Sequence, residues 1–212
     1  MIIGICGLIG SGKGTVADIL VDYHDFKKIS FADKVKDGVA AVFGWDRALL
    51  EGDTDRSRLW REKVDEYWTK ETGREITPRL VLQEFGTDCM RMGFYDAIWV
   101  SLVKKHMVDN PHYNYVIPDV RFPNEMSMIR ELGGQVWQVR RGDLPLWWAT
   151  AQSVNQNWDT CKDTNHSMAT VFPDVHQSEW RWVDSDNQFE HILTNNDTLE
   201  ALYSQVEQTL ST

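Results

Sequence analysis

The sequence predicts an α/β fold in which helices cover both faces of a largely parallel sheet. Short apolar runs of strand length alternate with stretches in which apolar residues recur at helical spacing. The first apolar run leads through a glycine-rich loop into a helical pattern, an order that favours parallel strands. A chain of 212 residues can build one sizeable core with insertions but is short for two full domains.

In the first half of the chain we expect strands at 2–6 and 27–30 and helices at 13–21 and 34–43. Residues 45–77 are charged and less periodic, which predicts short helical pieces joined by loops. A further helix should run over 78–92, because Leu82, Phe85, Cys89 and Met92 recur at helical spacing. Pro78 suits its first turn.

The second half continues with a helix at 94–109, a strand at 113–118, a helix at 125–132 and a strand at 135–139. The last strand is expected at 191–195. A helix follows it, for which Asp197 and Glu200 predict a capping box. The alternation lapses over about residues 141–184, here called the tryptophan-rich insertion, which we interpret as a lid over the active site. Five tryptophans should pack together within it: Trp147, Trp148, Trp158, Trp180 and Trp182.

Composition excludes several functions. The net charge of −10 argues against a surface that tracks duplex DNA or an anionic membrane. The apolar start lacks a basic leader and breaks into glycines, so a buried strand is expected there rather than a signal peptide. Beyond it, no stretch approaches the roughly 18 uncharged residues of a membrane helix. We therefore expect a soluble cytoplasmic protein with neither nucleic-acid nor membrane partners, and the aromatic content favours a homodimer.

The most specific motif is the loop GLIGSGKGT at residues 7–15, which lies where the first strand meets the first helix. In such a P-loop, glycines let backbone N–H groups converge on phosphate oxygens, and a lysine bridges the phosphates. The predicted nucleotide-binding residues are Gly10, Ser11, Gly12, Lys13, Gly14 and Thr15. The alternative is a glycine-rich turn without a ligand. The strict pattern places a hydroxyl directly after the lysine, whereas here Gly14 intervenes, which resembles the loop of adenylate-kinase-like nucleotide kinases.

A second group of candidates follows the strand at 113–118. Asp119 lies at its carboxyl end, where parallel sheets place their ligands, and could hold a magnesium-bound water. Arg121 could contact the acceptor phosphate or the transferred group. The alternative is an ordinary Asp–Arg surface pair.

Two further pairs are basic or amide side chains. Arg79 and Gln83 share a helix face and could bind a phosphate and read a base edge, or they form a solvated helix face. Arg140 and Arg141 end the strand at 135–139 and could neutralise phosphate charge from the lid, or they are ordinary basic residues at a strand end.

Taken in order, six segments make the chain resemble the deoxynucleoside monophosphate kinases of tailed phages. They are GLIGSGKGT, ISFADKVK, RLVLQEFGTDCMR, VIPDVRFPNE, GGQVWQVRR and HQSE. The resemblance covers nearly the whole chain and is weakest at 45–77 and 143–175. Only the first segment is specific by itself, so the ordered set carries the resemblance.

The resemblance implies transfer of the γ-phosphoryl group of MgATP to a deoxynucleoside monophosphate, in the host cytoplasm if a phage encodes the chain. It implies a single P-loop kinase domain with an adenylate-kinase-like fold, a nucleotide-monophosphate-binding helical insertion at about 33–110 and a lid at about 141–184. By the same resemblance, the residues at the phosphates and the metal are Lys13, Thr15, Asp119, Arg121, Arg140 and Arg141, and the residues facing the acceptor are Asp33, Lys34, Arg79, Gln83 and Asp88.

Two other functions remain open at this point. A phosphomevalonate kinase of the animal type has a similar glycine loop and D-x-R element. A P-loop protein could also hold ATP without transferring it, although the clustered arginines would then lack a use. Nucleic-acid processing conflicts with the acidic charge. The accepted base is not predicted, because an amide such as that of Gln83 can pair with purine or pyrimidine edges.

Overall fold

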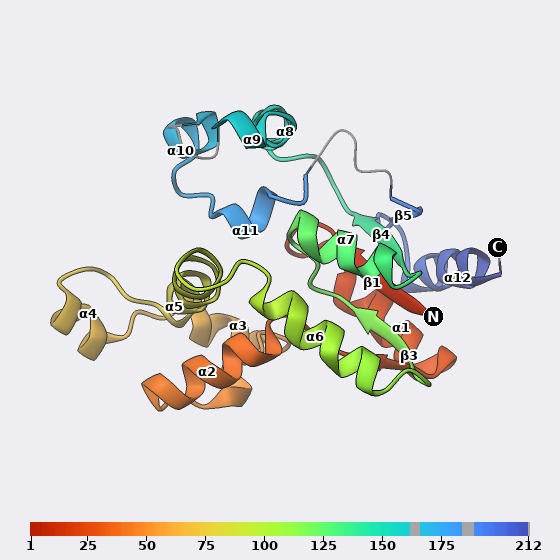
Figure 1. The fold of residues 1–212 in the computed structure, drawn as a ribbon, viewed down its shortest axis with the longest axis horizontal. Coiled ribbons are helices and arrows are strands. Elements are labelled where there is room, and N and C mark those ends of the chain that lie inside the picture. The colour runs from red at the N-terminus through yellow and green to blue at the C-terminus, as the bar shows by residue number, and fades with distance from the viewer. Residues whose placement is uncertain (162–165, 184–188, 212) are drawn as a thin grey trace. The chain divides into compact units, whose positions relative to one another are not determined.

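A sheet of five parallel strands organises the computed structural model, which describes residues 1–161, 166–183 and 189–211 (Figure 1). The strands are β1 (Ile2–Cys6), β2 (Phe26–Lys28), β3 (Asn114–Ile117), β4 (Gln135–Arg140) and β5 (His191–Thr194). Their order is β2-β3-β1-β4-β5, and every pairing is parallel. The predicted α/β class with a parallel sheet is therefore confirmed. The second strand begins and ends earlier than the predicted 27–30.

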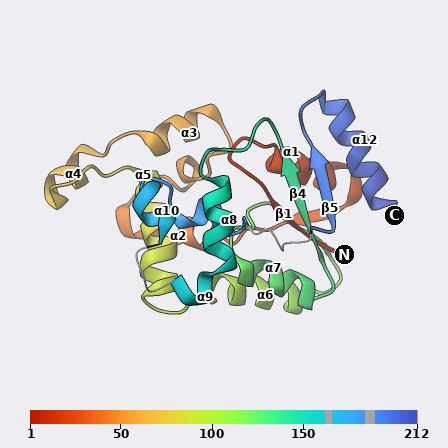
Figure 2. The same ribbon diagram turned by 90° about the horizontal axis from the view of Figure 1, so that it is seen from above.

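Helices cover both faces of this sheet, as the view from above shows (Figure 2). On one face lie α1 (Lys13–His24) and α12 (Leu199–Leu210), whose Leu20 and Val206 share an apolar cluster with Ile5 of β1. On the other face lies α7 (Pro123–Glu131). A Cβ added at Gly4 of β1 would lie 2.4 Å from Ile129 Cδ1, so this helix packs closely against the strand. The result is three layers with the P-loop at the carboxyl end of the central strand.

The chain divides into two compact units, Met1–Ser30 with Val103–Thr212 and Phe31–Leu102. The second unit is helical: α2 (Asp33–Phe43), the 3₁₀ helix η1 (Arg47–Leu50), α3 (Asp55–Glu62), α4 (Glu66–Thr72), α5 (Pro78–Gln83), η2 (Glu84–Met92) and the start of α6 (Ile98–Asp109). Its core contains Val39, Leu50, Ile76 and Val81. Aromatic rings flank that core, with Phe43 stacked on Trp45 at 4.6 Å. The predicted helical pieces at 45–77 are therefore confirmed.

One predicted helix changes its winding partway. Of the helix predicted at 78–92, the first part, α5, is an α-helix. The second part, η2, is a π-helix in which Gly93 N–H donates to Asp88 O at 3.1 Å. The indole N–H of Trp99 donates to Gly86 O at 2.8 Å, and an α-helix would use that carbonyl for the N–H four residues later. The predicted apolar face at 78–92 is consequently wrong at its end, where Cys89 and Met92 are exposed.

Within its described residues, the tryptophan-rich insertion contains four short helices: α8 (Trp148–Gln156), α9 (Trp158–Cys161), α10 (Ser167–Val171) and α11 (Gln177–Trp180). Helices α8 and α10 lie side by side (Figure 2). The predicted packing of its tryptophans is confirmed, with ring centroids 5.4 Å apart for Trp148 and Trp182 and 6.0 Å apart for Trp158 and Trp180. Residues 162–165 and 184 of the predicted insertion lie outside the described residues.

The last helix begins differently from the prediction. Its N-cap is Thr198, whose hydroxyl accepts from Ala201 N–H at 3.3 Å, so the capping box expected from Asp197 is wrong. A threonine in extended conformation can present its side-chain oxygen to the first turn as an aspartate does. Across the described ranges, no helix is long and apolar enough to cross a membrane.

Candidate active site

The P-loop joins the end of β1 to the start of α1 and packs closely against Val139 and Asn195. Gly7, Gly10 and Gly12 have positive φ angles of 152°, 75° and 103°, conformations that side-chain-bearing residues rarely adopt. A Cβ at Gly7 would lie 2.5 Å from Val139 O, and one at Gly12 would lie 2.2 Å from Asn195 Nδ2. Gly10 and Gly14 instead have no atom within 4 Å of such a Cβ. The loop therefore rests on β4 and on the residue after β5, and its glycines at 10 and 14 face open space.

Lys13 is the first residue of α1, and its side chain folds back over the loop. Its ammonium group donates to the carbonyl oxygens of Gly7 and Leu8, each at 2.7 Å. Burial and, after it, the nearby Arg121 guanidinium lower the pKa of Lys13 from 10.5 to about 8 overall, although Glu179 and Asp119 act in the opposite direction. The ammonium group is thus held beside the loop by two uncharged carbonyl oxygens.

The loop fits the phosphates of a nucleotide. Ser11 Oγ is buried and has no hydrogen-bond partner in the described part of the chain. The first N–H groups of any α-helix lack intrahelical partners, and here they belong to Lys13, Gly14 and Thr15. A phosphate at this helix end would receive backbone N–H groups, the positive end of the helix dipole and the buried hydroxyl.

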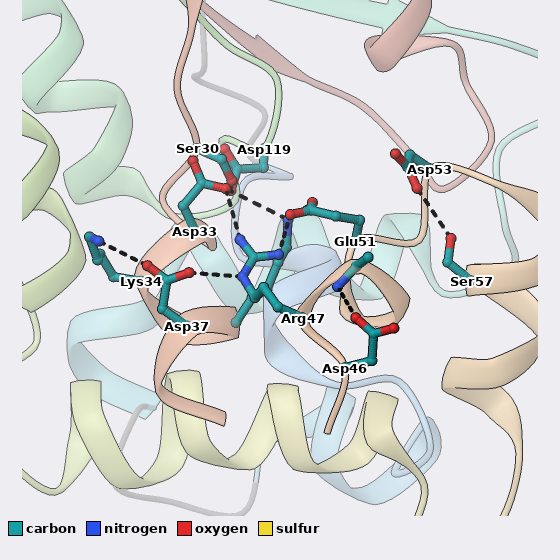
Figure 3. Close-up of polar contacts among 12 residues, drawn as sticks. Ser30, Asp33, Lys34, Asp37, Asp46, Arg47, Glu51, Asp53, Ser57 and Asp119 are labelled. Atoms are coloured by element: carbon teal, nitrogen blue, oxygen red, sulfur yellow. Dashed lines mark hydrogen bonds and ion pairs between the residues drawn. The ribbon is translucent and has the colours of Figure 1, made fainter. Parts of the chain in front are cut away.

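Asp119 and Arg121 follow β3 in a turn that is fixed from two sides. The Ser30 hydroxyl donates to Asp119 Oδ2 at 2.6 Å (Figure 3). The buried carboxylate of Glu125 accepts from Arg121 N–H at 2.6 Å and from Phe122 N–H at 3.0 Å. The bonds to Glu125 fix the backbone at Arg121, and the bond from Ser30 fixes the Asp119 carboxylate.

The Arg121 side chain reaches helix α11. Its Nη1 donates to Glu179 Oε1 at 2.8 Å and to Ser178 O at 3.4 Å. Because Arg121 and Glu179 both shift the Lys13 pKa, the three charges belong to one site. The structure therefore brings together Lys13, Asp119 and Arg121, which the sequence predicted, with Glu179, which it did not.

Arg140 and Arg141 lie at the end of β4, as predicted, and both are exposed. Arg140 Nε donates to Gln138 Oε1 at 2.7 Å on its own strand, and Gln138 is buried. The Arg140 carbonyl accepts from Asn195 N–H at 2.8 Å, and the Asn195 side chain donates to Ser11 O at 2.8 Å. The end of β4 is thus linked through Asn195 to the P-loop.

The acceptor-side candidates lie in the helical unit Phe31–Leu102. Asp33 and Lys34 begin α2, where Lys34 pairs with Asp37 at 2.8 Å and Asp33 lies 3.7 Å from Arg47 (Figure 3). Arg47 also bonds Asp37 and Glu51, so the start of α2 is a network of alternating charges.

The remaining acceptor-side candidates lie on α5 and η2. Arg79 pairs with Glu62 at 3.0 Å, Gln83 is half-buried at the end of α5, and Asp88 is exposed on the π-helix. Because the winding changes after Gln83, Asp88 does not keep α-helical spacing from Arg79 and Gln83.

Sequence reasoning missed four polar residues: Ser30, Glu125, Glu179 and Asn195. Each acts through partners distant in sequence or through the backbone, which no local pattern reveals. Glu179 was within reach, because it ends the HQSE segment that contributed to the resemblance. Asn195 was less clearly indicated by the sequence. It directly follows the last strand, at the carboxyl edge of the sheet where parallel sheets bind ligands.

Comparisons with known proteins decide the family. The sequence profile described as deoxynucleotide monophosphate kinase matches residues 57–145. A protein of Acanthamoeba polyphaga mimivirus, which carries a provisional deoxynucleotide monophosphate kinase name, is 31% identical over 218 residues. That match covers 97% of this chain and 94% of the mimivirus protein. The chain belongs to the deoxynucleotide monophosphate kinase family.

As a member of this family, the chain is a phosphotransferase of the nucleotide kinase class. A second relative, the deoxynucleoside-5′-monophosphate kinase of Escherichia phage T5, is 24% identical over 180 residues, covering 62% of this chain and 72% of the phage protein. Among solved structures, dephospho-CoA kinase from Campylobacter jejuni aligns with a TM-score of 0.46 and 13% identity over 99% of this chain and 95% of its own.

The family profile runs from α3 past the end of β4. It covers the segments that carry Arg79, Gln83, Asp88, Asp119 and Arg121. The P-loop precedes the matched range and is included in the longer match to the mimivirus relative. The family assignment therefore rests on both halves of the predicted site.

Proposed function

We propose that this chain transfers the terminal phosphoryl group of ATP to a deoxynucleoside 5′-monophosphate and releases a deoxynucleoside diphosphate and ADP. The observation that carries the proposal is the grouping of Lys13, Asp119 and Arg121 at the carboxyl ends of β1 and β3. The P-loop beside them contains the buried Ser11 hydroxyl, which has no partner among the described residues. Family membership supports the nucleotide acceptor.

On the donor side, the P-loop would hold the β- and γ-phosphates. Lys13 keeps its proton at neutral pH because its pKa is about 8. It would exchange the carbonyl oxygens of Gly7 and Leu8, which are uncharged, for charged phosphate oxygens. Binding therefore needs only a rotation of one side chain, without rearrangement of the loop.

Thr15 and Asp119 would hold a magnesium ion. A hydroxyl and a carboxylate are hard oxygen donors, and Mg²⁺ in kinases usually takes one or two carboxylates with water and phosphate oxygens. The Ser30 hydroxyl directs the Asp119 carboxylate by its 2.6 Å bond. When bound, the ion would neutralise charge on the phosphates during transfer.

The acceptor oxygen needs no strong general base, because a nucleoside monophosphate is already ionised at neutral pH. The protein's task is to align two anions and to neutralise their charge. Arg121 would serve this role beside Lys13, with Arg140 and Arg141 contributing from the end of β4.

We assign acceptor binding to the helical unit Phe31–Leu102, with Asp33, Lys34, Arg79, Gln83 and Asp88 as candidates. Arg79 is the strongest phosphate ligand among them, because its ion pair with Glu62 is partly exposed and can be exchanged. The Gln83 amide could hydrogen-bond a base edge, which makes this residue a candidate for base selection.

The reaction would take place in the cytoplasm, or in the host cytoplasm if a virus encodes the chain. ATP and deoxynucleotide monophosphates both occur there as free substrates. We expect the enzyme to act on these small anions and to bind neither nucleic acid nor membrane, in line with its acidic charge.

A substrate panel tests this proposal. The purified protein would be incubated with MgATP and, separately, with dTMP, dGMP, dCMP, dAMP, GMP or mevalonate 5-phosphate, and ADP would be measured with the phosphorylated product. We expect diphosphate from at least one deoxynucleotide. Product from mevalonate 5-phosphate alone, or ATP binding without any transfer, would contradict the proposed function.

Two variants test the assigned residues. Lys13→Ala and Arg121→Ala should each lower the turnover rate on the order of 10²- to 10³-fold, because each removes a cation from the transferred phosphoryl group. Arg130→Ala is the matched control, because Arg130 of α7 pairs with Glu190, which precedes β5. Turnover near the wild-type rate in Lys13→Ala or Arg121→Ala would remove that residue from the site.

A further inference from the structure

The Arg121 guanidinium is held by a residue of the tryptophan-rich insertion. Its Nη1 donates to Glu179 Oε1 at 2.8 Å and to Ser178 O at 3.4 Å. The Glu179 side chain is 17% exposed, whereas that of Arg121 is 39% exposed. Glu179 is therefore the more buried member of the pair, and Arg121 has the more exposed side chain.

Helix α11 holds Glu179 in a fixed place. The N-cap of the helix is His176, whose Nδ1 accepts from Ser178 N–H at 3.3 Å and lies 2.9 Å from Ser178 Oγ. The indole N–H of Trp182 donates to the Glu179 carbonyl at 2.9 Å, and that of Trp180 donates to Val175 O at 3.2 Å. Both ends of this short helix are thus tied by side chains.

Aromatic rings of the insertion pack against the tryptophans at the end of this helix. Trp180 and Trp182 are each 2% exposed and pack against Trp158 and Trp148. Arg181 stacks over the Trp158 ring with its guanidinium carbon 3.5 Å from the ring centre. Residues of α8 and α9 therefore fix the two tryptophans that follow Glu179.

Stability alone is a weak reason for the pair between Arg121 and Glu179. An ion pair with a partly exposed arginine contributes little to folding, because water screens it and both side chains lose freedom. Its stronger effect is geometric, since a carboxylate and a carbonyl on one nitrogen restrict the direction of the guanidinium plane.

We propose that Glu179 is a positioning residue that aims Arg121 at the transferred phosphoryl group, and that the tryptophan-rich insertion holds Glu179 in place for this purpose. This inference rests on the proposed function, in which Arg121 contacts a phosphate. It gives the insertion a role in catalysis through a single charged side chain.

The position of Glu179 gives its removal two effects of opposite sign. Its carboxylate pairs with Arg121 at 2.8 Å, so its negative charge also repels a phosphate that Arg121 would contact. Neutralising Glu179 should tighten the binding of a phosphate anion and, at the same time, slow transfer because Arg121 loses its orientation. A residue with only a structural role would weaken both properties together.

The first test is Glu179→Gln, which keeps the size of the side chain and removes its charge. We expect turnover to fall on the order of 10- to 100-fold, the range for a misplaced catalytic group. The Kd for inorganic pyrophosphate should decrease, and the KM for ATP should not rise. Glu190→Gln is the matched control, because Glu190 pairs with Arg130 at 2.9 Å, and its turnover should match the wild type.

A double-mutant cycle with Arg121→Ala decides whether Glu179 acts through Arg121. We expect Glu179→Gln to lower turnover no further once Arg121 is alanine, because the residue to be positioned is gone. Losses that multiply in the double variant, or a Glu179→Gln enzyme with wild-type turnover, would overturn the proposal.

A milder variant covers the case in which Glu179→Gln does not fold. Trp182→Phe keeps a ring in the core but removes the N–H bonded to the Glu179 carbonyl. We expect a several-fold loss of turnover with no rise of the ATP KM, and unchanged turnover in a folded Trp182→Phe protein would count against the inference.

Pyrophosphate binding separates this inference from the proposed function. If the wild type phosphorylates no deoxynucleotide, the proposed function fails. The coupling can still be measured, because Glu179→Gln should tighten pyrophosphate binding partly by releasing the Arg121 guanidinium to the ligand. That part is absent in Arg121→Ala, so Glu179→Gln should have a smaller effect there. Equal effects of Glu179→Gln in both backgrounds would then reject the coupling by itself.

Discussion

The burial of the Lys13 ammonium group should make the stability of this protein depend on pH in a predictable direction. In the folded chain its pKa is lowered from the ordinary 10.5 to about 8, chiefly by burial and then by Arg121. Between these two values the unfolded chain binds more protons than the folded chain, so the free energy of unfolding rises with pH. Below pH 8 the folded protein bears the full cost of a charged, buried amine.

The size of the effect follows from the two pKa values. Between about pH 7.5 and about pH 9.5, the wild type should gain about 2 kcal/mol of stability from this one group. Lys13→Met lacks the group and keeps an unbranched side chain of similar length. The difference in unfolding free energy, wild type minus variant, should therefore increase by about 2 kcal/mol over this range.

Urea unfolding of both proteins at the two pH values measures this difference, and all other titrating groups cancel between them. A difference that stays constant would mean that Lys13 is solvated, and one that falls would mean that a carboxylate holds it. Either result would refute the conclusion that burial lowers the pKa of the P-loop lysine.

Three further predictions concern single side chains. Asn195→Asp replaces the donor to Ser11 O with an acceptor, so the KM for ATP should rise roughly fivefold, the equivalent of about 1 kcal/mol, in steady-state kinetics. Thr198→Ala should destabilise the protein by about 1 kcal/mol in denaturant unfolding, whereas Asp197→Ala should change little; the reverse order would restore the predicted capping box. Arg79→Gln should raise the KM for the nucleotide acceptor on the order of tenfold and leave that for ATP unchanged, and an equal rise in both would place Arg79 elsewhere.

Much of the fold could be predicted from the sequence, because its signals are local. Buried parallel strands are continuous apolar runs, and helices carry an apolar stripe, so strand and helix alternate visibly along the chain. The glycines at 7, 10 and 12 mark the loop because their positive φ angles admit few other residues. Together these features indicated the parallel sheet and the position of the P-loop.

Other features depended on contacts that no local pattern contains. The π-helix at Glu84–Met92 is accompanied by a hydrogen bond from the Trp99 indole to Gly86 O, and no helical period in the sequence indicates that bond. Thr198 and Asp197 are residue types that both cap helices well, and in the structure Thr198 takes the extended N-cap conformation.

The partners of the site residues were equally hidden. Ser30 bonds Asp119 across 89 residues, and Glu179 bonds Arg121 across 58. The candidates themselves could be proposed because charged residues at strand ends are a recurrent feature of α/β sites. The residues that orient those candidates became visible only in three dimensions.

The most direct test of the central claim is to follow the phosphoryl group itself. The protein would be incubated with Mg²⁺, ATP labelled at the γ-phosphate and each deoxynucleoside monophosphate, and the products would be separated by chromatography. The proposed function predicts label in a deoxynucleoside diphosphate, formed in equal amount to ADP and absent without acceptor. Label found only in inorganic phosphate, or remaining entirely in ATP with every deoxynucleotide, would contradict it.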